Sequence, residues 1–252
     1  MPSNAHLPKT YGMVLFPGFQ ALDVFGVLDI LNTLSSFHHT LDLCLISSTL
    51  SPVSTAPVCP IGATSVFKSP NFHQSLLPTH TFADCPPVDV LVVPGGNGAR
   101  ADLAEVRDFV RGRFPHVQYF MTICTGAAIA AQAGVLDGFA ATSNKSAWKW
   151  VTAQSAAVRW VPRARWTVDG KVWTSSGVAA GLDAIFAFVE EVYGPAAAGH
   201  IQGLLEYERH MDPNWDPWSE KYGCKWPLEE KEGGDEGGVA GVGGKLEGGV
   251  NK

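Results

Sequence analysis

Three observations in the sequence predict an α/β fold with a mostly parallel sheet and helices on both of its faces. Short apolar runs alternate along the chain with segments of helical periodicity. Several of these runs are apolar throughout, which is typical of parallel strands that are buried on both sides. The runs end at turn-forming residues, most clearly at Pro94-Gly95-Gly96. With 252 residues, of which 46% are hydrophobic, the chain can bury one sizeable core.

The expected elements follow from this pattern in chain order. The expected strands cover residues 11–17, 42–47, 88–93, 117–123 and 172–175. The expected helices cover residues 21–34 and 101–113, a segment from Cys124 to about Ala133, and residues 181–193. We expect residues 1–10 to be an N-terminal extension, residues 11–228 to be the α/β domain, and residues 229–252 to be a disordered tail rich in Gly and Glu.

Composition excludes several classes of function. The formal net charge is -6 and the Lys and Arg residues are scattered, which argues against a nucleic-acid surface. The five cysteines show no close pairing, so neither a disulfide framework nor a metal site is expected, and no cofactor is suggested. No window approaches the ~20 apolar residues of a membrane span, and the first residues do not resemble a secretory signal. We expect a cytoplasmic protein that acts on a small molecule.

Cys124 is the most informative residue because it lies where an expected strand becomes a helix. The residues that follow it, Thr125, Gly126 and Ala127, have little side-chain bulk, as a sharp turn requires. A helix that begins there directs free N–H groups and the positive end of its dipole at the sulfur, which favours the thiolate. The alternative is a buried, unreactive cysteine. The sequence around Cys124 therefore predicts a nucleophile at a strand-to-helix turn.

Asp23 is the candidate partner of the thiol. It lies just past the first expected strand and near the start of the first helix, so it belongs to the same sheet edge as Cys124. The alternative is a first-turn carboxylate that only interacts with its own helix. Asp29 is about 240° further around the helix, so we expect it to be structural.

Pro94-Gly95-Gly96 could hold a developing anion, because the backbone N–H groups of Gly95 and Gly96 are not shielded by side chains. Thr125 could add its own N–H and hydroxyl. The alternative for the two glycines is an ordinary tight turn. The motif lacks the further residues of a nucleotide-binding loop.

Four strings together resemble a known family. LVVPGG (91–96), ICTGAAIAAQAGVLDG (123–138), ATSNKSAWKW (141–150) and SSGVAAGLD (175–183) are similar, in this order, to the ThiJ/PfpI superfamily of class I glutamine amidotransferase-like folds. The resemblance covers about residues 11–210 and implies a flavodoxin-like three-layer sandwich with a nucleophile elbow, as well as a homodimer. LDVFGVLDIL (22–31) is similar to a helix of the isonitrile hydratase branch. The resemblance makes Cys124 the nucleophile, Asp23 its acid/base partner, and Thr125 with Gly95 and Gly96 the anion hole.

One departure from the family pattern concerns position 144. Many relatives carry a histidine there, whereas this chain has Asn144. Because no imidazole base can act from this position, protease and amidotransferase chemistry is disfavoured and a Cys-Asp mechanism is favoured. Asn144 could still hydrogen-bond in the pocket, and Trp148 or Trp150 could form an apolar wall. His116 and His200 are only loosely placed as alternatives.

Three functions follow as hypotheses. The leading one is a cysteine-dependent hydratase or lyase, most concretely one that hydrates an isonitrile to an N-substituted formamide. The second is glyoxalase or deglycase chemistry on 2-oxoaldehydes, in which the thiol forms a hemithioacetal. The third is a redox sensor or chaperone-like protein whose low-pKa Cys124 becomes oxidised. Specificity is expected to depend on how segments 67–82, 144–150 and 205–218 close over the pocket.

Overall fold

The computed structural model describes residues 6–58 and 71–225. Seven strands in these ranges form one sheet, in the spatial order β10 (Trp166–Asp169), β11 (Val172–Ser175), β7 (Tyr119–Thr122), β6 (Val90–Val93), β1 (Thr10–Val14), β2 (Asp42–Ser47) and β5 (His80–Thr81). All neighbouring pairs are parallel except β10 and β11. The inner order β2-β1-β6-β7-β11 is the flavodoxin-like order. The predicted three-layer fold with a mostly parallel sheet is therefore confirmed.

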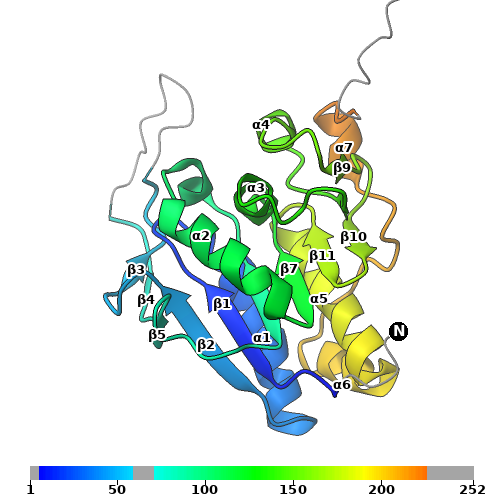
Figure 1. The fold of residues 1–252 in the computed structure, drawn as a ribbon. Coiled ribbons are helices and arrows are strands. Elements are labelled where there is room, and N and C mark those ends of the chain that lie inside the picture. The colour runs from blue at the N-terminus through cyan, green and yellow to red at the C-terminus, as the bar shows by residue number, and fades with distance from the viewer. Residues whose placement is uncertain (1–5, 59–70, 226–252) are drawn as a thin grey trace, which may run out of the picture.

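Helices cover both faces of this sheet (Figure 1). On one face lie α2 (Ala104–Arg113) and α3 (Gly126–Gln132), and on the other lie α1 (Ala21–Phe37), α5 (Val178–Tyr193) and α6 (Pro195–Leu204). Two short helices, α4 (Trp148–Thr152) and α7 (Pro217–Lys221), lie beyond the carboxyl ends of the strands. The remaining short elements are η1 (Asn97–Arg100), η2 (Phe114–His116), and the strand pairs β3 (Val53–Ser54) with β4 (Ser75–Leu76) and β8 (Ala140–Ala141) with β9 (Arg159–Trp160).

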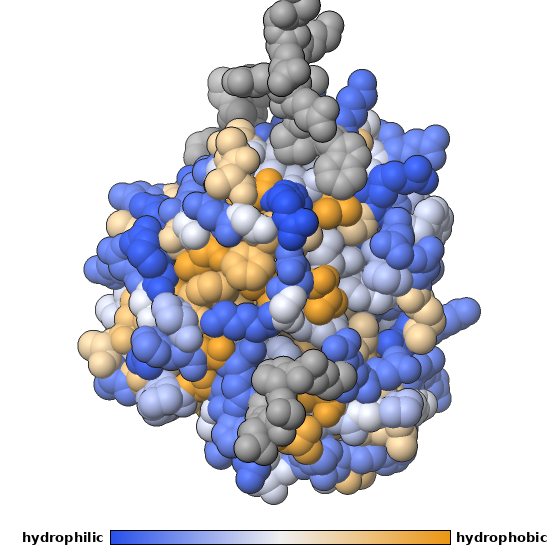
Figure 2. Space-filling view, turned by 45° about the vertical axis from the view of Figure 1, so that its right-hand side comes forward, coloured by the Kyte–Doolittle hydropathy of each residue, from blue (hydrophilic) through white to orange (hydrophobic). Residues whose placement is uncertain are grey.

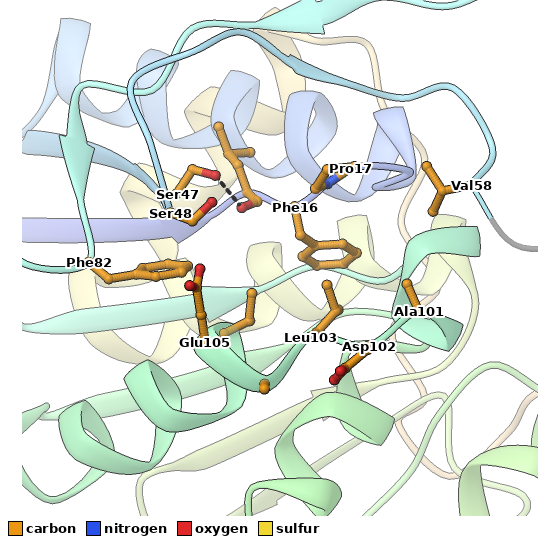
Figure 3. A pocket seen from close by; sticks show the side chains of 13 residues that line it. Phe16, Pro17, Ser47, Ser48, Val58, Phe82, Ala101, Asp102, Leu103 and Glu105 are labelled. Carbon is orange, nitrogen blue, oxygen red and sulfur yellow. Dashed lines mark hydrogen bonds between the residues drawn. The ribbon is translucent and has the colours of Figure 1, made fainter.

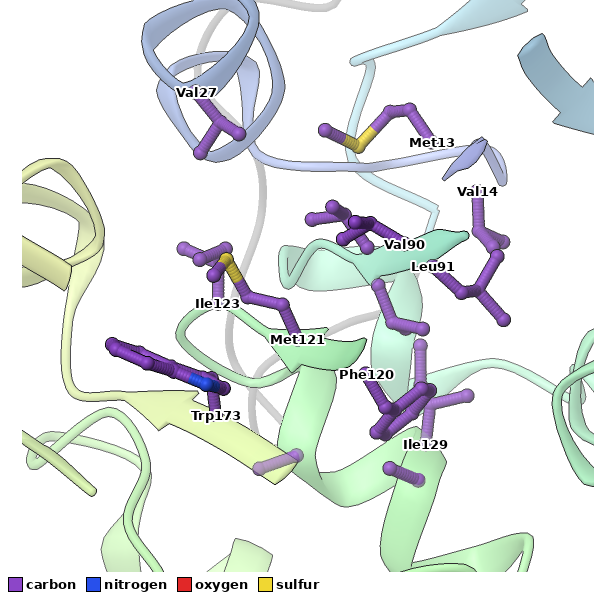
Figure 4. Packing of buried hydrophobic residues seen from close by; sticks show 14 of the residues in the cluster. Met13, Val14, Val27, Val90, Leu91, Phe120, Met121, Ile123, Ile129 and Trp173 are labelled. Carbon is purple, nitrogen blue, oxygen red and sulfur yellow. The ribbon is translucent and has the colours of Figure 1, made fainter. Parts of the chain in front are cut away.

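The core has two parts, one on each face of the sheet (Figure 4). Because side chains alternate along a strand, Met121 of β7 points toward α1, where Val27 lies, and Phe120 points toward α3, where Ile129 lies. All four side chains are buried. This two-sided burial is why the parallel strands read as continuous apolar runs in the sequence.

The predicted elements match the observed ones with small shifts at their ends. The helix expected over 101–113 begins later than predicted, because η1 ends at Arg100 and α2 begins only at Ala104. The edge strand β10 and the helix α6 were not predicted. Cys59 and the tail expected over 229–252 lie outside the described residues.

The surface is largely hydrophilic, and apolar side chains gather near the middle of the face shown in Figure 2. Among the described residues, no helix has the length and hydropathy needed to cross a bilayer. A contiguous apolar area often marks an interaction surface. The homodimer and the cytoplasmic location expected above stay predictions.

Candidate active site

Cys124 lies at a sharp turn between β7 and α3. Its φ of 57° is in the left-handed region, which is uncommon for a residue other than glycine. Gly126 makes the turn possible, since a Cβ there would lie 2.2 Å from the carbonyl oxygen of Val93. Ser143, which is fully buried, donates a hydrogen bond of 2.7 Å from its Oγ to the carbonyl oxygen of Cys124. The chain after β7 therefore has the geometry of a nucleophile elbow.

Asp23 lies in the first turn of α1, but its carboxylate does not cap that helix. Oδ2 accepts a hydrogen bond of 2.9 Å from the backbone N–H of Gly95, which follows β6. The other oxygen, Oδ1, is buried without a hydrogen-bond partner among the described residues. The side chain has no solvent exposure. The carboxyl ends of β1, β6 and β7 thus bring Asp23, Gly95 and Cys124 to one point, whereas Asp29 is exposed.

Gly95 and Gly96 form the bottom of this site, and their N–H groups are occupied. The N–H of Gly95 binds Asp23, and the N–H of Gly96 donates a hydrogen bond of 2.9 Å to Oγ1 of Thr125. A Cβ at Gly95 would lie 2.5 Å from the backbone nitrogen of Thr125 and 3.0 Å from Oδ2 of Asp23. In this structure the two glycines hold Asp23 and Thr125 in place. Their role as an anion hole stays a prediction.

Cys124 is not in the thiolate form that the sequence led us to expect. Burial and the nearby charge of Asp23 raise the pKa of Cys124 well above its usual value. The N–H of Thr125 and the side chains of Asn144 and Thr125 offset only part of this rise. The expectation that the turn favours a thiolate is therefore wrong for this structure, because loss of hydration and the charge of Asp23 outweigh the hydrogen bonds to the sulfur.

Burial acts on Asp23 in the same direction. It raises the pKa of Asp23 to about 7, although hydrogen bonds from Gly95 and the Cys124 thiol lower it in part. At neutral pH the thiol keeps its proton, and Asp23 is divided between its neutral and ionised forms. A buried carboxyl oxygen without a partner, next to a thiol, can accept and return the proton of that thiol.

Asn144 and Trp148 occupy different surroundings. The side chain of Asn144 hydrogen-bonds the Cys124 sulfur, while its Oδ1 accepts from the Ser146 hydroxyl and from the N–H of Ala147. Asn144 is thus placed as an amide donor toward the sulfur. Trp148 instead packs edge-on against Trp160, with its indole N–H bonded 2.9 Å from the carbonyl oxygen of Lys225. Its role as a wall of the substrate pocket stays a prediction.

A cavity of about 450 Å³ adjoins this site and has Asn144 and Gly177 among its lining residues. Residues 210–222 form its other side. Another cavity, of about 410 Å³, lies on the α2 side beyond β1 and β2, where Phe16, Phe82 and Leu103 face one another (Figure 3). Neither Cys124 nor Asp23 lines either cavity. Asn144, whose side chain hydrogen-bonds the Cys124 sulfur, lines the first cavity and not the second, so the first cavity lies beside the candidate active site.

Within residues 6–58 and 71–225, no group of three or more His, Cys, Asp or Glu side chains is arranged to hold a metal ion. The four cysteines in these ranges, Cys44, Cys85, Cys124 and Cys224, are free thiols. His200, a loosely placed alternative base, is paired with His38 at 2.9 Å between Nε2 and Nδ1, on the outer side of α1 and α6. Among the described residues, His200 is thus engaged away from Cys124, and His210 lines the cavity beside Asn144.

The sequence interpretation missed Ser143 and the residues of α5 that line the cavity. Ser143 precedes Asn144 in a string that already carried the family resemblance, but nothing in its pattern shows that its hydroxyl binds the carbonyl of Cys124. Of the segments expected to close the pocket, parts of 144–150 and 205–218 line the cavity near Asn144. The described part of 67–82 does not, and its Phe82 lines the cavity of Figure 3 instead.

Comparison with known proteins places this site in a family. The model of the DJ-1/PfpI family matches residues 11–191. The chain belongs to the DJ-1/PfpI family. Its match contains every candidate residue of the site, from Asp23 to Trp148.

Among DJ-1/PfpI-related proteins, an isonitrile hydratase from Pseudomonas putida is 30% identical over 198 residues, which is 78% of this chain and 77% of the relative. The crystal structure of a ThiJ/PfpI family protein from Pseudomonas syringae has a TM-score of 0.67 at 26% identity, and the match covers 83% of this chain and 81% of that one. The crystal structure of Drosophila melanogaster DJ-1beta has a TM-score of 0.62 at 20% identity, with 80% and 100% of the chains covered. This last likeness concerns the fold alone.

Proposed function

We propose that the protein is a cysteine-dependent hydratase that converts an isonitrile into an N-substituted formamide. Two findings support this proposal. A relative named isonitrile hydratase shares 30% of its residues over most of both chains. The thiol of Cys124 lies next to a buried carboxyl group, Asp23, and position 144 holds an asparagine instead of a histidine. The observation that carries the proposal is this pairing of a thiol with a carboxyl whose pKa is about 7.

The first half of the reaction joins the sulfur to the substrate. Asp23, as the carboxylate, takes the proton of the Cys124 thiol while the sulfur attacks the terminal carbon of R–N≡C. The same carboxyl then gives this proton to that carbon, which leaves a thioimidate, R–N=CH–S–Cys. A group with a pKa near the working pH suits both steps, because it neither holds the proton too tightly nor loses it too early. No atom leaves the substrate in this half-reaction.

The second half releases the product with water. Water adds to the thioimidate carbon, its oxygen bonding to carbon and one proton going to nitrogen. The intermediate R–NH–CH(OH)–S–Cys then breaks its C–S bond, so that R–NH–CHO leaves and the remaining hydroxyl proton returns to the sulfur through Asp23. Asn144, which donates to the sulfur, supports the negative charge that develops there as the bond breaks.

The raised pKa of Cys124 also bears on the other hypotheses. A redox sensor depends on a thiolate that is present at neutral pH, whereas burial and Asp23 keep this thiol protonated. A sensor is therefore disfavoured. Glyoxalase chemistry would use the same thiol and is separated from hydration by assay.

The test is turnover of a simple alkyl isonitrile by the purified protein, with methylglyoxal assayed alongside. We expect formamide production that Cys124→Ala abolishes and that Asp23→Asn lowers by ~10²–10⁴-fold, the usual contribution of acid/base catalysis. Asp29→Asn, on the exposed side of the same helix, is the matched control and should retain activity. Turnover by Cys124→Ala, or conversion of methylglyoxal alone, would contradict the proposal.

A further inference from the structure

The second cavity, shown in Figure 3, lies apart from Cys124 and takes no part in the proposed reaction. Its volume is about 410 Å³, within the range of small-molecule sites. Residues 15–17 line it just after β1, and Ser47 and Ser48 line it at the end of β2. Open parallel sheets bind ligands beyond the carboxyl ends of their strands. The second cavity therefore lies where the fold can hold a further ligand.

The inner part of the second cavity is apolar. Phe16, Leu103 and Val106 are buried there. Phe82 lies across the cavity from Phe16 (Figure 3) and is stacked on Phe109 of α2, with 4.8 Å between the ring centroids. This stacking fixes the position from which Phe82 contacts the cavity. A hydrocarbon or aromatic group between Phe16 and Phe82 would lose its contact with water, which is favourable.

The charge at the opening of the second cavity is negative. Among the described residues that line it, the charged side chains are Asp102 and Glu105, and none is a cation. Asp102 is paired with Arg107 at 3.0 Å, and its side chain is 85% exposed. Glu105 forms no ion pair within the described ranges, and its side chain extends toward Phe82 (Figure 3). An apolar interior is thus combined with a carboxylate at the opening.

The start of α2 does not reverse this preference for positive charge. Glu105 lies in the first turn, where free N–H groups and the positive end of the dipole stabilise its carboxylate. An anionic ligand would therefore meet a carboxylate at this helix end. The hydroxyl of Ser47 is also occupied, because it donates to the carbonyl oxygen of Leu15 at 3.0 Å. The second cavity thus offers few donors to an anion, whereas its carboxylates can accept from a protonated amine.

We propose that the second cavity binds a small aromatic ammonium compound, with its ring between Phe16 and Phe82 and its charged nitrogen beside Glu105. A protonated amine donates N–H groups to carboxylate oxygens and is attracted to the face of an aromatic ring. Because the opening is exposed, the nitrogen keeps part of its hydration and no charge has to be buried. This site does not depend on the hydratase function, since neither Cys124 nor Asp23 lines it.

The first experiment measures the Kd of four probes for the full-length protein by isothermal titration calorimetry. Phenethylammonium carries the ring and the positive charge, phenethyl alcohol the ring alone, ethylammonium the charge alone, and hydrocinnamate the ring with a negative charge. We expect phenethylammonium to bind most tightly, and loss of the ring to raise Kd by up to about tenfold. Hydrocinnamate should be the weakest of the aromatic probes. Added salt should weaken phenethylammonium and leave phenethyl alcohol unchanged.

Substitutions at the opening test the role of the charge. Glu105→Gln should raise the Kd of phenethylammonium about two- to fivefold, the contribution of one exposed ion pair, and leave that of phenethyl alcohol unchanged. Glu105→Lys should reverse the order, so that hydrocinnamate binds more tightly than phenethylammonium. Ala101→Trp places an indole in the cavity and should abolish binding of all three aromatic probes. The charge reversal decides the proposal even if the tryptophan variant does not fold.

Two matched controls separate the second cavity from the rest of the molecule. Glu191→Gln removes an exposed carboxylate of α5, on the other face of the sheet. Trp218→Ala removes a half-exposed aromatic ring from the first cavity. Both variants should bind phenethylammonium as the parent protein does.

Three results would overturn the proposal. The first is equal affinity of the parent protein for phenethylammonium and hydrocinnamate, and the second is no binding of any aromatic probe. The third is binding that Trp218→Ala weakens and that Glu105→Gln and Glu105→Lys leave unchanged, because the ligand would then occupy the first cavity.

Discussion

Asp23 and Cys124 show how burial decides the chemistry of single residues. The sequence predicted Asp23 as a site residue because it follows the first strand of a parallel sheet. The carboxyl ends of the strands in such a sheet lie at one edge. The protonation state of the thiol could not be predicted, because the loss of hydration depends on neighbours that are distant in the sequence, among them Asp23 and Asn144. The hydrogen bonds that Thr125 and Asn144 make to the sulfur do not offset that loss. Position in the chain therefore indicated which residues meet, and three-dimensional packing sets their pKa values.

The raised pKa of Asp23 predicts a pH-dependent stability. A carboxyl whose pKa rises from 3.8 to about 7 on folding binds a proton more tightly in the native state. The free energy of unfolding should therefore fall as pH rises through the interval from about 4 to about 7, and then level off. We expect Asp23→Asn to become more stable relative to the parent protein as pH rises from 4 to 8, measured by urea denaturation.

Asp29→Asn is the control for that measurement, since its side chain is exposed. It should not gain stability over the parent protein across the same pH interval. A constant difference between Asp23→Asn and the parent protein from pH 4 to pH 8 would show that burial does not shift this carboxyl.

At the scale of elements, buried parallel strands were predictable and the edge elements were not. β6 and β7 are apolar over most of their length and bounded by turn residues. The edge strand β10 mixes polar and apolar residues, because only Trp166 of its four residues is buried. α6 begins at a proline and contains Gly199 and Gly203, which lower its helix propensity, so its helical state depends on packing against α5.

The nucleophile elbow depends on Ser143. We expect Ser143→Ala to destabilise the fold by about 1–3 kcal/mol, because the buried carbonyl oxygen of Cys124 loses its hydrogen bond. Its kcat on the isonitrile should fall more than its KM changes, since the sulfur is displaced while the cavity is intact. Urea denaturation and steady-state kinetics measure the two effects.

Ser36→Ala is the matched control, as Ser36 is exposed and bonds only to the backbone of its own helix. Unchanged stability and unchanged kcat in Ser143→Ala would mean that the positive φ of Cys124 is held by other contacts.

At the scale of the whole molecule, the order of the strands brings the site residues together, and the buried ion pair between Arg165 and Asp183 lies beside the cavity next to them. Asp183 of α5 binds Arg165, accepts a hydrogen bond of 3.0 Å from the Tyr207 hydroxyl, and accepts another of 3.0 Å from the N–H of His210. Asp183 thus connects Arg165, which precedes β10, to residues 207–210, of which His210 lines the cavity. Such a contact between distant segments leaves no local pattern in the sequence.

Asp183→Asn should therefore be strongly destabilising. It leaves the buried Arg165 without a counter-charge, which costs about 3–5 kcal/mol in comparable pairs. Asp169→Asn breaks the more exposed pair with Arg159 and should cost less than about 1 kcal/mol. Urea denaturation compares the two variants, and equal losses would show that Asp183 is no more important than a surface ion pair.

We propose that Cys124 works with a carboxyl group whose pKa is near 7, and the pH dependence of kcat/KM on an alkyl isonitrile tests this pairing most directly. Asp23 must be ionised to accept the thiol proton, so kcat/KM should rise with pH through about 7 and reach a plateau. In Asp23→Asn the remaining activity should lose this rise. A profile that is flat from pH 5 to pH 9 in the parent protein, or one that Asp23→Asn leaves unchanged, would contradict the pairing.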